Sequence, residues 1–373
     1  MAPLELYQKI YVSAEFLETE HGQLGCETCH GGDPREPDWQ AAHRGVVKDP
    51  TFPDPSSTCG QCHEEIAETA SHSLHYSLAT FDRVIAQRVG KTDADREVRI
   101  AAAKEKHCGQ CHASCGQCHV SRPNYVRGGL LAKHIFQKPP PMNVTCAACH
   151  GGRVFAEYTG LDEEFEPDVH FEEDMACLDC HSAEEMHADP GEVPTRFDVP
   201  QRPACLQCHP EVKAENTTIE AHRLHREKLA CQVCHAQENK NCFMCHVGTD
   251  KKGLPYFKCK RTVMSFKIGL NPMKSEARPY DYAVLRHPPT HPGLFDFYVK
   301  DAFSRFDSLP TWKLDAPHNI RRITERNRSC NNCHGNRDLF LGSADMPTWE
   351  ISANTGVIVP DGRVPQKIDR PEE

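Results

Sequence analysis

Ten copies of one short motif, Cys-x-x-Cys-His, dominate the chemistry available to this 373-residue chain. The motifs use 20 of the 21 cysteines, and only Cys259 lies outside them. The cysteine pairs are Cys26 and Cys29, Cys59 and Cys62, Cys108 and Cys111, Cys115 and Cys118, Cys146 and Cys149, Cys177 and Cys180, Cys205 and Cys208, Cys231 and Cys234, Cys242 and Cys245, and Cys330 and Cys333. The histidines that follow them are His30, His63, His112, His119, His150, His181, His209, His235, His246 and His334.

This spacing suits covalent attachment of haem. Two thiols three positions apart can add to the two vinyl groups of one haem, and the next residue then lies under the iron as an axial ligand. Disulfides and zinc sites also use Cys-x-x-Cys pairs, but neither needs a histidine after every second cysteine. The sequence therefore predicts ten c-type haems, each tethered by two motif cysteines and ligated by a motif histidine.

Thirteen histidines outside the motifs can supply the second axial ligand. Ten irons need at most ten of them. We assign this role to His21, His43, His75, His134, His170, His187, His222, His225, His291 and His318. His72 and His75, like His222 and His225, are three positions apart, so each pair shares a helix face and can reach two neighbouring haems. We expect one member of the first pair to be spare, only one of His287 and His291 to bind, and His107 to be a packing residue.

Two histidines on each iron fill both axial positions, so that the iron can change charge but cannot bind a substrate. No motif carries Lys in place of its histidine, and histidines for the second position are not in short supply. We therefore expect electron transfer and no catalytic residue. A multihaem reductase and a conductive cytochrome polymer stay open as alternatives, which high-spin iron and particle length, respectively, would distinguish from a simple carrier.

The expected fold follows from what must position the haems. Hydrophobic residues make up 38% of the chain, too few for the core that this length normally builds, so porphyrins are expected to fill the interior. We predict helices over 64–89, over 92–107 with Thr92 or Asp93 as N-cap, and over 211–229. The predicted fold is mainly α and coil with little sheet, wrapped around a continuous haem stack. Residues 1–250 form the haem-wrapping unit with nine motifs, and 251–373 close the stack with the tenth haem.

Charge and hydropathy limit the partners. The formal net charge is −10, and haem propionates make it more negative, which argues against a nucleic-acid partner. Residues 161–192 hold thirteen acidic side chains and no Lys or Arg, whereas 251–278 hold eight basic ones. Either run is a solvated face or a docking surface for a redox protein, and the two together could support self-assembly. The aromatic stretch 251–329, which has no motif, either wraps the end of the stack or forms a partner surface.

No uncharged apolar run is long enough for a membrane-spanning helix. The first twenty residues lack the apolar segment of a secretory signal, so we expect a signal to have been removed or the numbering to start at the mature chain. Haem attachment of this type implies a periplasmic or extracellular location. We expect the partners to be redox proteins, among them a membrane quinol-oxidising or outer-membrane complex.

A chain this dense in Cys-x-x-Cys-His motifs resembles the multihaem c-type cytochromes, and in count and size the decahaem cytochromes of outer-membrane electron conduits. Residues 108–246 are also similar to the octahaem tetrathionate reductase and hydroxylamine oxidoreductase group. The residues that carry this second resemblance are CHASCGQCH, DVHFEEDMACLDCHSAEEMH and HRLHREKLACQVCH. The resemblance implies a shared haem arrangement and reduction of sulfur or nitrogen oxyanions. The chain departs from that group in having no Cys-x-x-Cys-Lys motif and two more haem sites.

Overall fold

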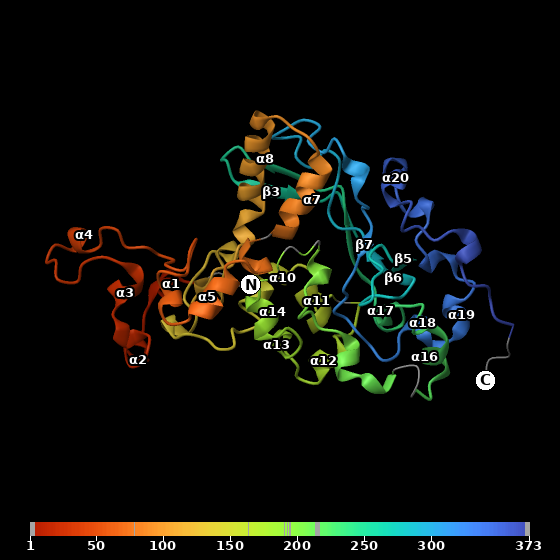
Figure 1. Ribbon diagram of the computed structural model, residues 1–373, viewed down its shortest axis with the longest axis horizontal. Coiled ribbons are helices and arrows are strands. Elements are labelled where there is room, and N and C mark those ends of the chain that lie inside the picture. Colours follow the sequence, from red (N-terminus) through yellow and green to blue (C-terminus); the bar gives the residue numbers. More distant parts are fainter. Residues whose placement is uncertain are drawn as a thin grey trace. The chain divides into compact units, whose positions relative to one another are not determined.

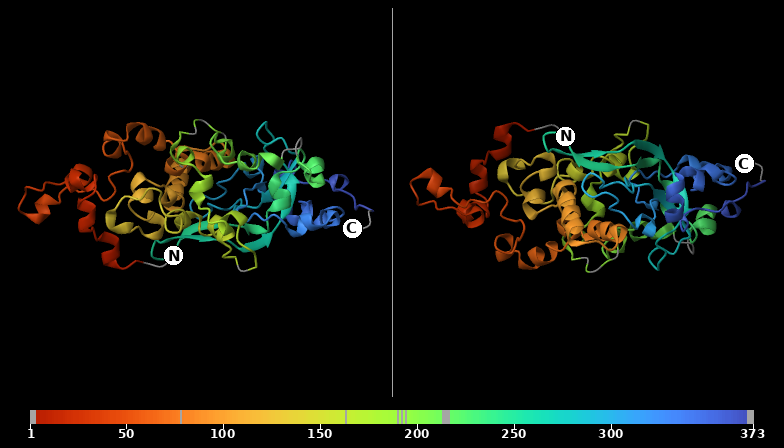
Figure 2. Two further views of the ribbon diagram at one scale, coloured as in Figure 1. Left: turned by 90° about the horizontal axis from the view of Figure 1, so that it is seen from below. Right: turned by 90° about the horizontal axis from the view of Figure 1, so that it is seen from above.

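A computed structural model describes residues 4–369, except 78, 163, 190, 192, 194 and 213–216 (Figure 1). It is 41% helix and 10% strand, with small antiparallel sheets, which confirms the prediction of a mainly helix-and-coil fold. Two further views of the same elements are given in Figure 2. Within the described part of the chain, no helix is both long and apolar enough to cross a membrane.

The α-helices of the described residues are short, and all but those over Ala79–Val89 and Ala94–His107 are only one or two turns long. They are α1 (Leu6–Ile10), α2 (Ala14–Leu17), α3 (Cys26–His30), α4 (Trp39–Ala42), α5 (Glu64–Ala70), α6 (Leu74–Ser77), α7 (Ala79–Val89), α8 (Ala94–His107), α9 (Cys115–His119), α10 (Cys146–His150), α11 (Val154–Thr159), α12 (Val169–Glu172), α13 (Cys177–Cys180), α14 (Ala183–His187), α15 (Cys205–Cys208), α16 (Glu220–His225), α17 (Cys231–His235), α18 (Glu325–Arg328), α19 (Cys330–Cys333) and α20 (Ile351–Asn354). Such short helices cannot be stable alone, so their stability must come from packing.

The motifs account for many of these short helices. Seven motifs coincide with α3, α9, α10, α13, α15, α17 and α19, and two more begin on the 3-10 helices Cys59–Gln61 and Gly109–Cys111. On one helical turn, positions i, i+3 and i+4 share a face, so both cysteines and the histidine point the same way. The motif at Cys242 is the exception, because it lies on two strands.

The predicted helix over 64–89 is interrupted. It appears as α5, α6 and α7, and residue 78 between the last two lies outside the described residues. Ser71 donates a side-chain hydrogen bond to the Glu68 carbonyl, and Ser77 donates one to the Ser73 carbonyl. Serine hydroxyls that bond preceding carbonyls compete with helical pairing, which explains the breaks. The predicted helix over 92–107 is α8, and Asp93 caps it by accepting from the Arg96 amide at 2.9 Å.

Three small antiparallel sheets occupy the region after Asn239, where the sequence led us to expect almost none. β1 (Asn239–Phe243) pairs with β4 (Arg261–Ser265), and β2 (His246–Thr249) pairs with β3 (Pro255–Lys258). β5 (Lys267–Leu270), β6 (Tyr282–Arg286) and β7 (Lys313–Leu314) form the third sheet. The predicted helix over 211–229 is reduced to α16, although 213–216 lie outside the described residues.

The chain forms two compact units, each discontinuous in sequence. Unit 1 comprises Met1–Asp82, Cys108–Gly152 and Ala176–Arg202, and it holds the first six motifs. Unit 2 comprises Arg83–His107, Arg153–Met175 and Pro203–Glu373, and it holds the other four.

The two units differ in their apolar cores. Unit 2 packs α7 and α8 against residues 295–306, and a second cluster surrounds Trp312 and Leu341. Among the described residues of unit 1, the only buried hydrophobic side chains are Phe16, Tyr76, Leu131, Val199 and three alanines. Among its described residues, the unit with six motifs therefore has only a small buried apolar core.

Candidate haem-binding sites

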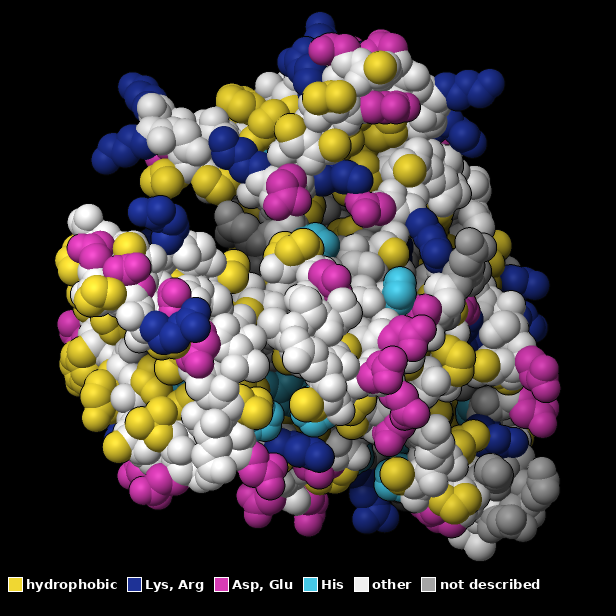
Figure 3. All heavy atoms as spheres, turned by 60° about the vertical axis from the view of Figure 1, so that its left-hand side comes forward, with side chains coloured by type: hydrophobic (Ala, Val, Ile, Leu, Met, Phe, Trp, Pro, Cys, Tyr) yellow, Lys and Arg dark blue, Asp and Glu magenta, His cyan; other side chains and the backbone are white. Residues whose placement is uncertain are grey.

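All twenty histidines predicted to bind iron keep accessible surface. None of the ten motif histidines and none of the ten assigned partners is buried. By contrast, His107 is 4% exposed and His287 is 0% exposed. Figure 3 shows histidine side chains at the surface and within recesses of one face. The predicted ligands are therefore accessible, as residues that bind an added group must be.

Seven motif histidines each face a histidine from another segment at nearly constant spacing. An imidazole nitrogen lies about 2.0 Å from a first-row metal and roughly 1.1 Å from its ring centroid, so two axial imidazoles have centroids about 6.2 Å apart. In unit 1 the pairs are His21–His63 at 6.3 Å, His30–His134 at 6.0 Å, His75–His150 at 6.3 Å and His119–His187 at 6.1 Å. In unit 2 they are His170–His209 at 6.2 Å, His222–His235 at 6.0 Å and His225–His334 at 6.0 Å.

The angles between these paired rings range from 22° to 75°. Rings that bind one metal from opposite sides share an axis and can turn about it, so a constant distance with variable angles fits axial ligation. Aromatic rings in direct contact have centroids about 4.5–7 Å apart, so the narrow 6.0–6.3 Å range shared by all seven pairs, and not any single distance, indicates axial ligation. The residues present therefore fit seven irons with two axial histidines each.

Hydrogen bonds orient most of the motif histidines. Eight of them place Nδ1 against an oxygen acceptor, so that Nδ1 carries the proton and Nε2 is left for a metal. The acceptors are the carbonyls of Val47 for His30, Tyr76 for His112, Gln137 for His119, Arg321 for His235, Gly293 for His246 and Gln366 for His334, and the carboxylates of Glu185 for His181 and Glu211 for His209. His170, which faces His209 of the motif at Cys205, is oriented by a carboxylate. Its Nδ1 donates to buried Asp168 at 2.7 Å, and this hydrogen bond raises the pKa of His170.

The two pairs of histidines that are three positions apart have different surroundings. His222 and His225 each face a different motif histidine, as the spacing predicts. In the other pair, His75 faces His150, whereas His72 donates to the Glu68 carbonyl and lies 3.9 Å from Asp189.

Several histidines have other surroundings. His107 bonds the Tyr298 hydroxyl through Nε2 at 2.7 Å. His287 uses both ring nitrogens, one toward the Cys242 carbonyl and one toward Glu350. His43 donates from Nδ1 to the Trp39 carbonyl, and His318 places Nδ1 against the Ala316 carbonyl.

The motif at Cys242 differs from the others. His246 and His291 have ring centroids only 4.6 Å apart, too close for an iron between them. The Gly293 amide donates to His291 Nδ1, so the proton of neutral His291 lies on Nε2. Nε2 of His246 is buried without a hydrogen-bond partner, and Cys245 is the one buried cysteine among the 21. In this structure the assigned partner His291 does not stand at ligand spacing.

Thiols from different motifs meet in pairs. Cys59 contacts Cys115 and Cys146 contacts Cys177 in unit 1, and Cys205 contacts Cys231 in unit 2. The hydrogen bond from Cys115 lowers the pKa of Cys59 to about 7. Cys111 also meets Cys149. These contacts bring together motifs that are separate in the sequence, such as those at Cys59 and Cys115.

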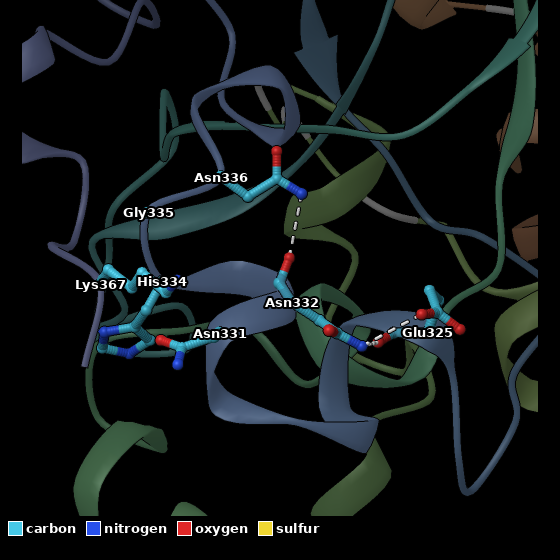
Figure 4. Close-up of a pocket in the computed structure, with 7 residues that line it drawn as sticks. All are labelled: Glu325, Asn331, Asn332, His334, Gly335, Asn336 and Lys367. Carbon is cyan, nitrogen blue, oxygen red and sulfur yellow. Dashed lines mark hydrogen bonds between the residues drawn. The ribbon is translucent and has the colours of Figure 1, made fainter. Parts of the chain in front are cut away.

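The last motif borders an open pocket of about 460 Å³ (Figure 4). His334 and Asn331 lie on one side of it, and Glu325 accepts from the Asn332 amide on the other. Lys367 from the C-terminal segment completes the rim. The pocket leaves one side of the His334 ring open.

The charged runs are partly paired. In unit 2, Arg321 binds Glu166 and Glu172, and Lys240 binds Asp162. The stretch 251–261 is exposed throughout, and its Lys251, Lys252, Lys258 and Lys260 have no carboxylate partner among the described residues. Exposed Tyr256 and Phe257 lie in the same stretch.

No protein-family model, no curated protein and no solved structure matches this chain. Among the described residues, no group of three or more His, Cys, Asp or Glu side chains could hold a metal ion. The paired histidines provide two ligands per site, which suits a metal whose other ligands come from a porphyrin.

Sequence reasoning missed three features of these sites. Asp168 and Glu185 lie two and four positions from the histidines they orient, a spacing that could have indicated them. Nothing in the sequence indicated the ring of Phe52, whose centroid lies 6.3 Å from that of His112.

Proposed function

We propose that this chain is a c-type cytochrome that carries electrons through ten covalently bound haems. The motif cysteines tether the haems and the motif histidines bind the irons. When bound, the haem iron supplies a one-electron couple that needs no bond to substrate. The protein's residues hold the rings, orient the axial imidazoles and keep the porphyrin edges close together.

The seven histidine pairs carry this proposal. Each joins a motif histidine to one that is not in a motif, at a spacing of 6.0–6.3 Å that matches two ligands of one iron. Zinc sites or disulfides would not need that spacing, because neither places a metal between two opposed imidazoles. A filled sixth position favours electron transfer over substrate chemistry at these seven irons.

The thiol contacts support a route for electrons within each unit. In unit 1 they connect the motif at Cys59 with that at Cys115, and the motif at Cys146 with that at Cys177. In unit 2 they connect the motifs at Cys205 and Cys231. Close edges between neighbouring haems allow an electron to pass without leaving the protein.

We further propose that the protein works in the periplasm or outside the cell and exchanges electrons with another redox protein. The exposed lysines of 251–261 favour an acidic partner, and electrostatic docking gives brief contacts that salt weakens.

A redox titration of the purified holoprotein tests the function. Dithionite should reduce it by ten electrons per chain, and an oxidised acidic cytochrome should recover those electrons at a rate that falls as salt rises. A protein that takes up no electrons, or cannot pass them on, would contradict the proposal.

A further inference from the structure

The histidine of the third motif faces an aromatic ring instead of a histidine. Among the described residues, the ring of His112 contacts only that of Phe52, with centroids 6.3 Å apart and planes inclined by 50°. This is the spacing at which seven other motif histidines face an imidazole. Phenylalanine has no lone pair to offer a metal.

The orientation of His112 leaves one nitrogen for iron. Nδ1 donates to the Tyr76 carbonyl at 2.6 Å, so Nε2 is the free ligand atom. Resting on the haem attachment proposed above, we propose that the iron bound by His112 keeps an open sixth position on the side of Phe52, where a small uncharged ligand binds.

Local charge sets the ligand class. In the sequence, Phe52 lies between Asp49 and Asp54. Asp49 accepts hydrogen bonds from the hydroxyls of Thr51 and Ser114. Ser114 directly precedes the motif cysteine Cys115. A negative field disfavours anions and leaves neutral diatomic ligands unaffected.

Two other histidines bear on the choice of this iron, His43 as a candidate sixth ligand and His246 as another motif histidine. His43, the assigned partner nearest in sequence to Phe52, is exposed and makes its only described ring contact with Trp39. His246 also lacks a histidine at ligand spacing, but its Nε2 is buried. His112 combines accessible surface with an anchored Nδ1 and a facing ring that cannot ligate.

Electrons can reach this iron from a neighbouring haem. Cys111 of the third motif meets Cys149 of the fifth, whose His150 faces His75 at 6.3 Å. The open iron thus adjoins a site with two axial histidines, so a bound ligand would be in electronic contact with the chain of haems.

The test is carbon monoxide titration of the reduced holoprotein, with magnetic resonance of the oxidised form. We expect a carbon monoxide site that Phe52→His removes, with one equivalent of high-spin iron becoming low-spin, because the new imidazole stands at ligand spacing. The matched Phe52→Leu and His72→Ala variants should keep the site. Asp54→Asn should strengthen azide binding to the oxidised protein and leave carbon monoxide binding unchanged.

Two results would overturn the inference: no carbon monoxide binding and no high-spin iron in the unmodified protein, or unchanged carbon monoxide stoichiometry in folded Phe52→His. If Phe52→His fails to fold, the unmodified protein still decides, because the absence of both signals would rule out an open iron. None of these outcomes removes the haems, so they are distinct from failure of the proposed function, which absence of electron uptake would reveal.

Discussion

His119 and His187 face each other with ring centroids 6.1 Å apart, although one ends the motif helix α9 and the other ends α14. The Gln137 carbonyl fixes Nδ1 of His119, and burial lowers the pKa of His187. A neutral imidazole opposite an anchored motif histidine is the arrangement that an iron with two axial histidines requires.

Replacing His187 should open one iron. In His187→Ala we expect one further equivalent of high-spin haem and one additional carbon monoxide site, because the iron bound by His119 loses its sixth ligand. Magnetic resonance and carbon monoxide titration measure this change. His72→Ala is the matched control and should change neither signal, since His72 lies against Glu68 and Asp189. An unchanged spectrum in His187→Ala would contradict the pairing.

The buried carboxylate beside His170 should tune a reduction potential. In Asp168→Asn we expect the haem tethered by Cys205 to become easier to reduce, because an anionic acceptor on Nδ1 of a ligand stabilises the oxidised iron. Glu211→Gln, which alters the exposed 3.4 Å contact on the other ligand, His209, should shift the potential less. Potentiometric titration checks both, and a larger shift in Glu211→Gln would refute this ranking.

His107 should contribute to stability and not to ligation. Its hydrogen bond to Tyr298 is partly buried. We expect His107→Ala and Tyr298→Phe each to lower the free energy of unfolding by about 1–2 kcal/mol, with strong non-additivity in the double variant and no change in spin state. Denaturant unfolding measures the first effect and magnetic resonance the second. A new high-spin iron in His107→Ala would show that His107 is a ligand.

Cys259 should be the only free thiol in the holoprotein. After denaturation, iodoacetamide should add one group per chain, on Cys259, because thioether bonds occupy the other twenty cysteines. Although the Cys259 residue is exposed, partial desolvation of its thiol, followed by the nearby Cys242, raises the pKa of Cys259, so its thiolate forms at higher pH than that of an ordinary thiol. In the folded protein, alkylation should therefore speed up only above the pH at which a free thiol reacts. Peptide mass mapping that finds further alkylated motif cysteines would contradict complete attachment.

The sequence predicted α8 with its Asp93 cap, and the shared helix face of His222 and His225, because both depend on local spacing. The positions i, i+3 and i+4 fix one helix face, and His222 and His225 follow the same geometry. The strands around Cys242 were not predicted, because the motif there is the same as in the helical sites and the two-residue alternation of burial in β1 was overlooked. The contact of His112 with Phe52 was not predicted, because the two residues are 60 positions apart and only tertiary packing brings them together.

The mass of the intact, denatured holoprotein tests the central claim most directly. Thioether bonds survive denaturation, so the account predicts a mass that exceeds that of the chain by ten haems. A mass equal to that of the bare polypeptide, or one that matches bound zinc lost on chelation, would contradict it.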